Sequence, residues 1–216
     1  MQVLLPPSEG KTAPRRGKPL DLAALACADE LRATRERVLA ALDDGAALRA
    51  APTAAAAKVY AGVLYQRLGL AELPAPARRR VLVFSGLWGV LRPGDRIPAY
   101  KLPIDTPRSQ LWRPVLRDTL PDSGLMIDLR SGPYASLWAP RDAAVVSVRG
   151  FTEQDGRRKV ISHMVKATRG DVARLVLTAE RRPKRPEDVA EIVAASGRRV
   201  ELAEARGAWT LDVIER

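Results

Sequence analysis

The stretch Val81-Leu82-Val83-Phe84-Ser85-Gly86-Leu87-Trp88-Gly89-Val90-Leu91-Arg92-Pro93-Gly94-Asp95-Arg96-Ile97-Pro98-Ala99-Tyr100-Lys101-Leu102 is the part of the sequence around which the chain is organised. It opens with an apolar, β-branched run over 81–84, which predicts a buried strand. Leu87, Val90 and Leu91 then recur at helical spacing, and Pro93-Gly94 would end that short helix. We therefore expect a strand, a turn at Ser85-Gly86 and a short helix.

A second helical piece is expected from Asp95 to the stop at Pro98, so 84–102 predicts a helix-hairpin-helix motif. Backbone N–H groups exposed at its Pro-Gly hairpin, beside Arg92, Arg96 and Lys101, can hold a phosphate. The alternative interpretation is a strand–turn–helix corner whose glycines only permit tight packing.

Composition favours a single α+β domain over 1–216 with a polyanionic partner. The chain has 216 residues, 46% of them apolar, and a formal net charge of +11. That charge favours DNA or nucleotides, unless the arginine excess only reflects the coding composition of the genome. No apolar run approaches a membrane span, and Pro6-Pro7 interrupts the N-terminus too early for a signal peptide. We therefore expect a cytoplasmic protein with no membrane partner.

The N-terminus predicts a strand over 3–5 followed by the loop Pro6-Pro7-Ser8-Glu9-Gly10-Lys11-Thr12. Gly10-Lys11-Thr12 is the second half of a phosphate-binding loop, but Leu5 occupies the position of the first glycine. A looser anion site would use Ser8, Gly10 and Lys11. The alternative is a proline-rich loop with a solvated lysine.

Several further elements follow from periodicity. A helix is expected over 21–42, with Arg32, Arg35 and Arg37 on its solvated side. Tyr60 and Tyr65 either stack on bases or pack on the core. A helix is expected over 109–120 and a strand over 125–129. Strands over 144–149 and 159–162 should pair around a turn at Asp155-Gly156. A helix that includes 166–170 and runs to about 180, a helix over 186–195 and a hairpin of 200–204 with 209–214 complete the chain.

A strand followed by a polar turn occurs three times, after Leu5, Phe84 and Leu129. Since ligands of α/β sheets collect at the carboxyl ends of strands, we expect Lys11, Arg92 and Arg130 to surround one cleft. Lys166 and Arg169, three residues apart on a predicted helix, would face the same cleft. Gly170 inside that helix indicates close approach by a ligand or another backbone.

The stretch 85–102 resembles the central motif of the YaaA family of peroxide stress resistance proteins, Ser-Gly-Leu-Tyr-Gly-Val-Leu-Arg-Pro followed by Asp and Pro-Tyr-Arg-Leu. Here Trp88 replaces Tyr, Ala99 separates Pro98 from Tyr100, and Lys101 replaces Arg. Five other segments are similar to family motifs. They are 6–12, 58–65, the pair Leu111-Trp112, the positions Asp128, Arg130, Ser131 and Tyr134, and the positions Ser162, Lys166 and Arg169-Gly170.

The resemblance implies a mixed α+β domain with an embedded helix-hairpin-helix that binds DNA and limits iron-linked oxidative damage. The candidate nucleic-acid or phosphate-binding residues are Ser8, Glu9, Lys11, Ser85, Gly86, Trp88, Gly89, Arg92, Gly94, Asp95, Tyr100, Lys101, Asp128, Arg130, Ser131, Tyr134, Lys166 and Arg169.

A second hypothesis remains open: an enzyme that binds a nucleobase, nucleotide or phosphorylated metabolite in the same cleft. Asp128 or Glu9 would then act as general base. We expect no cofactor and no metal, because one histidine and the single Cys27 offer no ligand cluster. Basic residues spread over an open surface would favour DNA, and a closed pocket gathering Glu9, Asp128 and Tyr134 would favour the enzyme.

Overall fold

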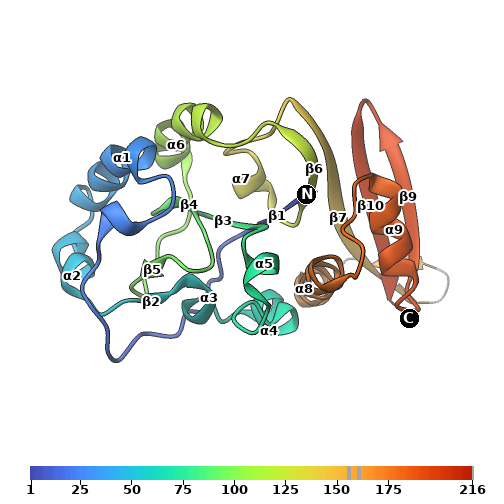
Figure 1. Cartoon of the computed structure of the whole chain (residues 1–216), viewed down its shortest axis with the longest axis horizontal. Coiled ribbons are helices and arrows are strands. Elements are labelled where there is room, and N and C mark those ends of the chain that lie inside the picture. Colours follow the sequence, from blue (N-terminus) through green and yellow to red (C-terminus); the bar gives the residue numbers. More distant parts are fainter. Residues whose placement is uncertain (155–156, 160–161, 216) are drawn as a thin grey trace.

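A computed structural model describes residues 1–154, 157–159 and 162–215. One mixed sheet forms the centre, with the strand order β4-β3-β1-β6-β7-β10-β9, and β8 pairs with β7 (Figure 1). Its strands are β1 (Gln2–Leu5), β3 (Val81–Ser85), β4 (Gly89–Leu91), β6 (Ser123–Asp128), β7 (Asp142–Gln154), β8 (Arg157–Lys159), β9 (Arg199–Ala205) and β10 (Ala208–Glu215). The short strands β2 (Ala54–Ala55) and β5 (Arg96–Ile97) form a separate antiparallel pair.

The inner strands of the sheet are parallel and its edges are antiparallel. β3, β1, β6, β7 and β10 all run in one direction. β4 and β9 turn back along the two edges. The carboxyl ends of β1, β3 and β6 therefore lie along one side of the sheet, called here the carboxyl edge.

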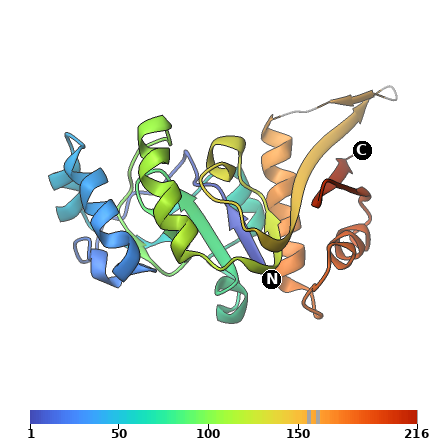
Figure 2. The same cartoon turned by 90° about the horizontal axis from the view of Figure 1, so that it is seen from above.

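Helices cover both faces of this sheet, with α6 and α7 on one side and α4, α5 and α8 on the other (Figures 1 and 2). The helices are η1 (Leu22–Ala24), α1 (Ala28–Ala40), α2 (Gly45–Ala50), α3 (Ala56–Val59), α4 (Val63–Leu68), α5 (Ala75–Arg78), α6 (Thr106–Thr119), α7 (Gly132–Ala135), α8 (Ser162–Thr178) and α9 (Pro186–Ala194). This arrangement confirms the expected single α+β domain. None of the helices in the described ranges is long and apolar enough to span a membrane.

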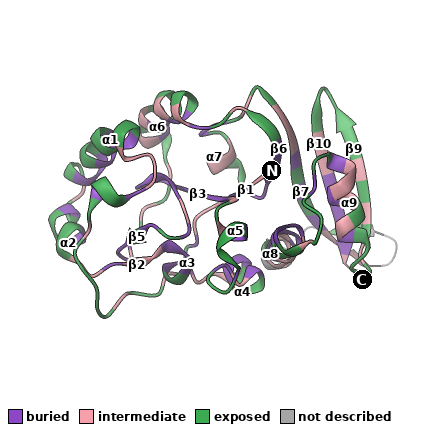
Figure 3. Cartoon of the chain, in the orientation of Figure 1, coloured by how far each residue is buried: buried purple, intermediate pink, exposed green. Residues whose placement is uncertain are grey.

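The core lies where the central strands meet these helices, and every residue of 81–91 is buried (Figure 3). Inner parallel strands are covered on both faces, so they form continuous apolar runs. This burial explains why 81–84 was readable as a strand from sequence alone.

The predicted helix-hairpin-helix over 84–102 is wrong, because the segment contains β4 and β5 and no helix. The hydroxyl of Ser85 accepts hydrogen bonds from the backbone N–H groups of Leu87 and Trp88, each at 3.1 Å, which makes a tight turn. Gly89 has a φ of +71°, and a Cβ there would lie 2.6 Å from the Trp112 ring. The glycine therefore serves tight packing, as the alternative interpretation expected.

The Pro93-Gly94 turn is stabilised by the buried carboxylate of Asp95. The Asp95 carboxylate accepts hydrogen bonds from the N–H groups of Arg92 and Ala26, each at 3.0 Å. Burial raises the pKa of Asp95, opposed by these two N–H groups and by the charges of Arg35 and Arg92. Gly94 is exposed, and a Cβ there would have no other atom within 4 Å.

The helix expected over 21–42 is interrupted at Cys27, whose φ of 53° separates η1 from α1. Arg35 does not lie on the solvated side, as predicted, but is fully buried. Its guanidinium donates to the carbonyls of Trp88, Ala26 and Val90 at 2.8–3.1 Å. Burial lowers its pKa to about 10. Leu31, Arg35 and Leu39 are spaced by four, so Arg35 belongs to the buried stripe of α1.

Most C-terminal predictions hold, but the strand expected over 159–162 lies earlier, because β8 spans Arg157–Lys159 and Ser162 begins α8. The hairpin of β9 and β10 occurs as expected, and β7 with β8 extends beyond the body of the molecule (Figure 2). The turn expected at Asp155-Gly156 lies outside the described residues. Gly170 meets another backbone, as a Cβ there would lie 2.4 Å from the Leu64 carbonyl oxygen of α4.

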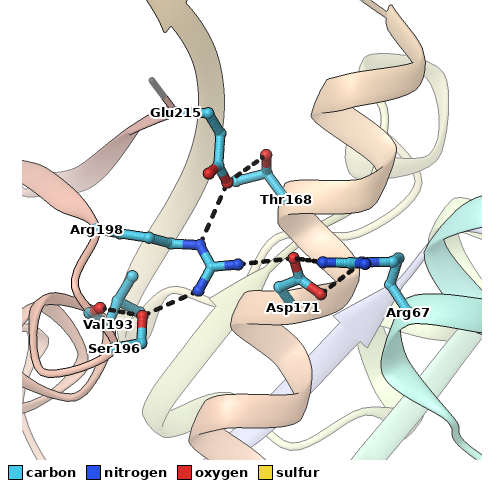
Figure 4. Close-up of polar contacts among 7 residues, drawn as sticks. All are labelled: Arg67, Thr168, Asp171, Val193, Ser196, Arg198 and Glu215. Atoms are coloured by element: carbon cyan, nitrogen blue, oxygen red, sulfur yellow. Dashed lines mark hydrogen bonds and ion pairs between the residues drawn. The ribbon is translucent and has the colours of Figure 1, made fainter.

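A polar network joins the C-terminal hairpin to the helices (Figure 4). Asp171 of α8 accepts two hydrogen bonds from Arg67 of α4 and one, at 2.8 Å, from Arg198. Arg198 also donates to Glu215 of β10 at 3.2 Å, and the Thr168 hydroxyl donates to the same carboxylate oxygen. Three segments of the chain are thus connected through two side chains, Asp171 and Arg198.

Candidate functional site at the carboxyl edge

The three predicted polar turns, after Leu5, Phe84 and Leu129, meet at the carboxyl edge, because β1, β3 and β6 are parallel neighbours. Leu4 of β1 pairs with Asp128 of β6, and Leu5 pairs with Val83 of β3. The loop carrying Ser8, Glu9 and Lys11 therefore emerges between the ends of β3 and β6.

Lys11 is half-buried at the centre of this edge. Its Nζ donates to the Ser8 carbonyl at 2.6 Å and lies 4.3 Å from the centroid of the Tyr100 ring and 5.8 Å from that of Tyr60. Burial lowers the pKa of Lys11 to about 8, and the charge of Glu9 opposes the shift. Lys11 is thus neither the solvated lysine of a loop nor part of a P-loop.

A chain of hydroxyl groups runs beneath Lys11. The Tyr100 hydroxyl lies 2.7 Å from Ser85 Oγ and 2.7 Å from the Tyr60 hydroxyl. Ser85 Oγ already accepts two backbone N–H groups, so its own proton must go to Tyr100, and that of Tyr100 to Tyr60. The hydroxyl hydrogen of Tyr60 is left without an acceptor among the described hydrogen bonds. Burial raises the pKa of all three buried tyrosines here, Tyr60, Tyr65 and Tyr100, so their hydroxyls stay protonated.

Tyr60 and Tyr65 pack on the core rather than presenting faces to bases. Their rings stack with centroids 5.1 Å apart, and the Tyr65 hydroxyl donates to the Pro6 carbonyl at 2.6 Å. The hydrogen bond from Tyr65 to Pro6 fixes the start of the loop that carries Lys11.

Asp128 and Arg130 form a buried bidentate pair. Arg130 Nε and Nη2 lie 2.9 and 2.7 Å from the two carboxylate oxygens, and the guanidinium carbon lies 4.2 Å from the centroid of the Phe84 ring. In such a pair both carboxylate oxygens already accept charge-assisted hydrogen bonds from the guanidinium. Asp128 is therefore a poor candidate for a general base. The Arg130 guanidinium is buried against Asp128 and the Phe84 ring at the carboxyl edge.

Glu9 and Arg108 act electrostatically on the Tyr134 hydroxyl. Burial raises the pKa of Tyr134, a backbone hydrogen bond with Ile104 and the charge of Arg108 oppose this shift, and the charge of Glu9 adds to it. Arg108, which no sequence pattern indicated, pairs with Asp105 at 2.7 Å. Glu9 and Ser131 are exposed.

The beginning of α8 lies beside this edge. Ser147 of β7 pairs with Asp128, so Gly150 is three residues beyond the end of β6, and a Cβ there would lie 3.3 Å from Val165 Cα. Lys166 is exposed, whereas Arg169 is partly buried and donates to the Val148 carbonyl at 3.1 Å. Burial lowers the pKa of Arg169, and the charge of Asp128 opposes the shift. Lys101, which follows Tyr100, is exposed as well.

Arg92 does not join Lys11 and Arg130, so the prediction of one three-cation cleft is wrong. Arg92 Nη1 donates to Arg79 and Val81 carbonyls and to the Gln2 side chain, at the amino ends of β3 and β1. It follows β4, which runs antiparallel to β3 and returns the chain to the opposite edge.

Other selected residues of the central stretch make internal contacts. Trp88 is fully buried with its ring edge-on to Tyr100 at 5.7 Å, and Gly86 accepts a hydrogen bond from Trp112 Nε1 at 2.9 Å. Together with Gly89, Gly94 and Asp95 they shape the corner that carries Ser85 and Tyr100.

Comparisons with known proteins agree with the motifs. The model of the family described as "Peroxide stress protein YaaA" matches residues 1–198. A UPF0246 protein of Streptomyces coelicolor is 38% identical, with 99% of this chain and 98% of that protein covered. A UPF0246 protein of Corynebacterium efficiens is 36% identical, covering 95% of this chain and 97% of that protein.

Proposed function

The chain belongs to the peroxide stress protein YaaA family, and we propose that it binds DNA in the cytoplasm and limits iron-linked oxidative damage to it. The observation that carries DNA binding is the group of cations around the carboxyl edge. Half-buried Lys11 lies inside it, and exposed Lys101 and Lys166 flank it. No ion pair to any of the three occurs among the described residues.

The phosphate contacts are assigned to Lys101 and Lys166 rather than to a hairpin around Gly94. Backbone-directed binding of this kind depends weakly on sequence and strongly on salt. Arg92 is excluded from these contacts, because its guanidinium already serves backbone carbonyls at the other edge.

Fluorescence anisotropy of labelled duplexes across a salt series tests this proposal. Lys101→Ala and Lys166→Ala should each lower the slope of log affinity against log salt by about 0.9 and weaken all sequences alike. Exposed Lys18→Ala, on the loop before η1, is the matched control and should bind as the parent does. The proposal fails if the parent shows no salt-dependent binding near physiological salt, or if both variants, with melting temperatures unchanged, keep its slope.

The second candidate function is an enzyme for a nucleotide or phosphorylated metabolite, and a specific observation favours it. A lysine with a lowered pKa above a buried hydroxyl chain is an arrangement found in active sites. A panel of nucleotides and sugar phosphates distinguishes the two candidates by thermal shift. A ligand-dependent rise in melting temperature that Lys11→Met abolishes, without DNA binding by the parent, would favour the enzyme.

A further inference from the structure

Lys11 is held in a fixed position and in an environment that disfavours its charge. The loop around it is pinned to the segment before α4 by hydrogen bonds from Thr12 N–H to the Val59 carbonyl at 2.8 Å and from Ala61 N–H to the Gly10 carbonyl at 3.1 Å. Its amine touches one carbonyl and two aromatic faces, and no carboxylate of the described chain lies within ion-pair distance.

A second polar group beside Lys11 has no partner. Ser8 Oγ is buried without a hydrogen bond, and the residue is 7% exposed. Gly62 packs directly against it, since a Cβ there would lie 2.4 Å from this oxygen and only a glycine fits beside Ser8. A buried hydroxyl without a partner is costly, so it indicates a group that binds there.

Building on the proposed DNA binding, we propose that Lys11 forms an imine with an aldehyde of the bound ligand, which in damaged DNA is the ring-opened sugar of an abasic site. The nucleophile is the neutral amine. With a pKa of about 8, about a quarter of Lys11 is neutral at pH 7.5, against about one in a thousand for a solvated lysine.

The step balances without any oxidant or reductant. The amine nitrogen bonds to the aldehyde carbon and loses one proton while the carbonyl oxygen gains one, which gives a carbinolamine. The nitrogen then loses its second proton, the hydroxyl gains a proton, and the C–O bond breaks as water leaves, so amine and aldehyde yield one imine and one water. The Ser8 hydroxyl donates a hydrogen bond to the carbonyl oxygen, and the protons that the oxygen takes up are those that leave the nitrogen.

Borohydride trapping tests this assignment, because reduction turns the imine into a stable amine link. The parent protein, mixed with a duplex carrying one abasic site, should give a covalent protein–DNA species whose peptide map places the link at Lys11. The trapped fraction should rise toward pH 8 as the free amine increases. An undamaged duplex of the same sequence should give none.

Variants separate chemistry from binding. Lys11→Arg keeps the positive charge and should lose the trapped species, while Lys18→Arg should trap as the parent does. If the parent binds undamaged duplex but traps no abasic duplex, or if Lys11→Arg traps equally, the inference is wrong and DNA binding stands.

Reaction with a small aldehyde and cyanoborohydride tests the inference if the parent does not bind DNA or if Lys11→Arg does not fold. Peptide mapping of the parent should then show Lys11 modified at least about tenfold faster than Lys18, which combines the larger neutral fraction with a weaker nucleophile. Equal rates would overturn the inference.

Discussion

At the scale of single residues, Lys11 stands out because the fold imposes a free-energy cost on its ammonium. Polar contacts supply little compensation: one carbonyl accepts its hydrogen bond, and two tyrosine faces lie beside it. A residue that weakens its own fold in the charged form is typical of a functional position.

This cost is measurable as a pH dependence of stability. The pKa of Lys11 in the folded chain, about 8, lies below that of an unfolded lysine, about 10.4, so the unfolded chain binds more protons between these values. The free energy of unfolding of the parent should therefore rise from pH 8 to pH 10 relative to that of Lys11→Met, and stay level below pH 8. For a chain of this size, each kcal/mol gained in free energy of unfolding raises the Tm by about 2–4 °C. Urea unfolding at four pH values measures this difference in free energy of unfolding between the parent and Lys11→Met. The prediction is contradicted if the difference between the parent and Lys18→Met changes with pH in the same way.

At the scale of elements, the contact between α4 and α8 depends on Gly170. Because a Cβ would lie 2.4 Å from a backbone oxygen and 2.7 Å from Arg67 Cβ, the two helices would have to separate. We expect Gly170→Ala to destabilise the chain by about 1–3 kcal/mol, the cost of overpacking. Gly94→Ala, at a position with open space, is the control and should stay within about 0.5 kcal/mol. Denaturant unfolding of both variants decides, and equal midpoints would contradict the close contact.

Elements were predictable where a local pattern decides them. The run 81–84 and the C-terminal hairpin follow from apolar periodicity, and the strand-end rule brought Lys11 and Arg130 together. The corner after Ser85 was misread because Leu87, Val90 and Leu91 are buried on every side, so helical spacing carries no information there.

The rest of the site depends on tertiary direction and pairing, which no local pattern encodes. Arg92 was misplaced because antiparallel β4 reverses the edge to which its end points. The Ser85, Tyr100 and Tyr60 hydroxyl chain joins three distant segments and was therefore invisible in the sequence.

At the scale of the whole molecule, the sheet continues through β7 into β10, so the C-terminal hairpin and the carboxyl edge share one framework. α8 connects them physically. Its beginning carries Lys166 beside the edge, and its middle carries Asp171 toward the hairpin. Loosening the hairpin should therefore alter the position of α8.

Asp171→Ala tests this coupling, since Asp171 binds both Arg67 and Arg198 while being only 14% exposed. Its loss leaves Arg198, 21% exposed, without one of its two carboxylates, which should cost about 1–3 kcal/mol. We expect amide hydrogen exchange in β9 and β10 to accelerate before that in β1 and β3, because the hairpin loses a contact that the central strands never make. Asp118→Ala removes a pair with both partners mostly exposed and should change stability by less than about 0.5 kcal/mol. Uniform acceleration across all strands would mean that the hairpin and the body unfold only as one unit.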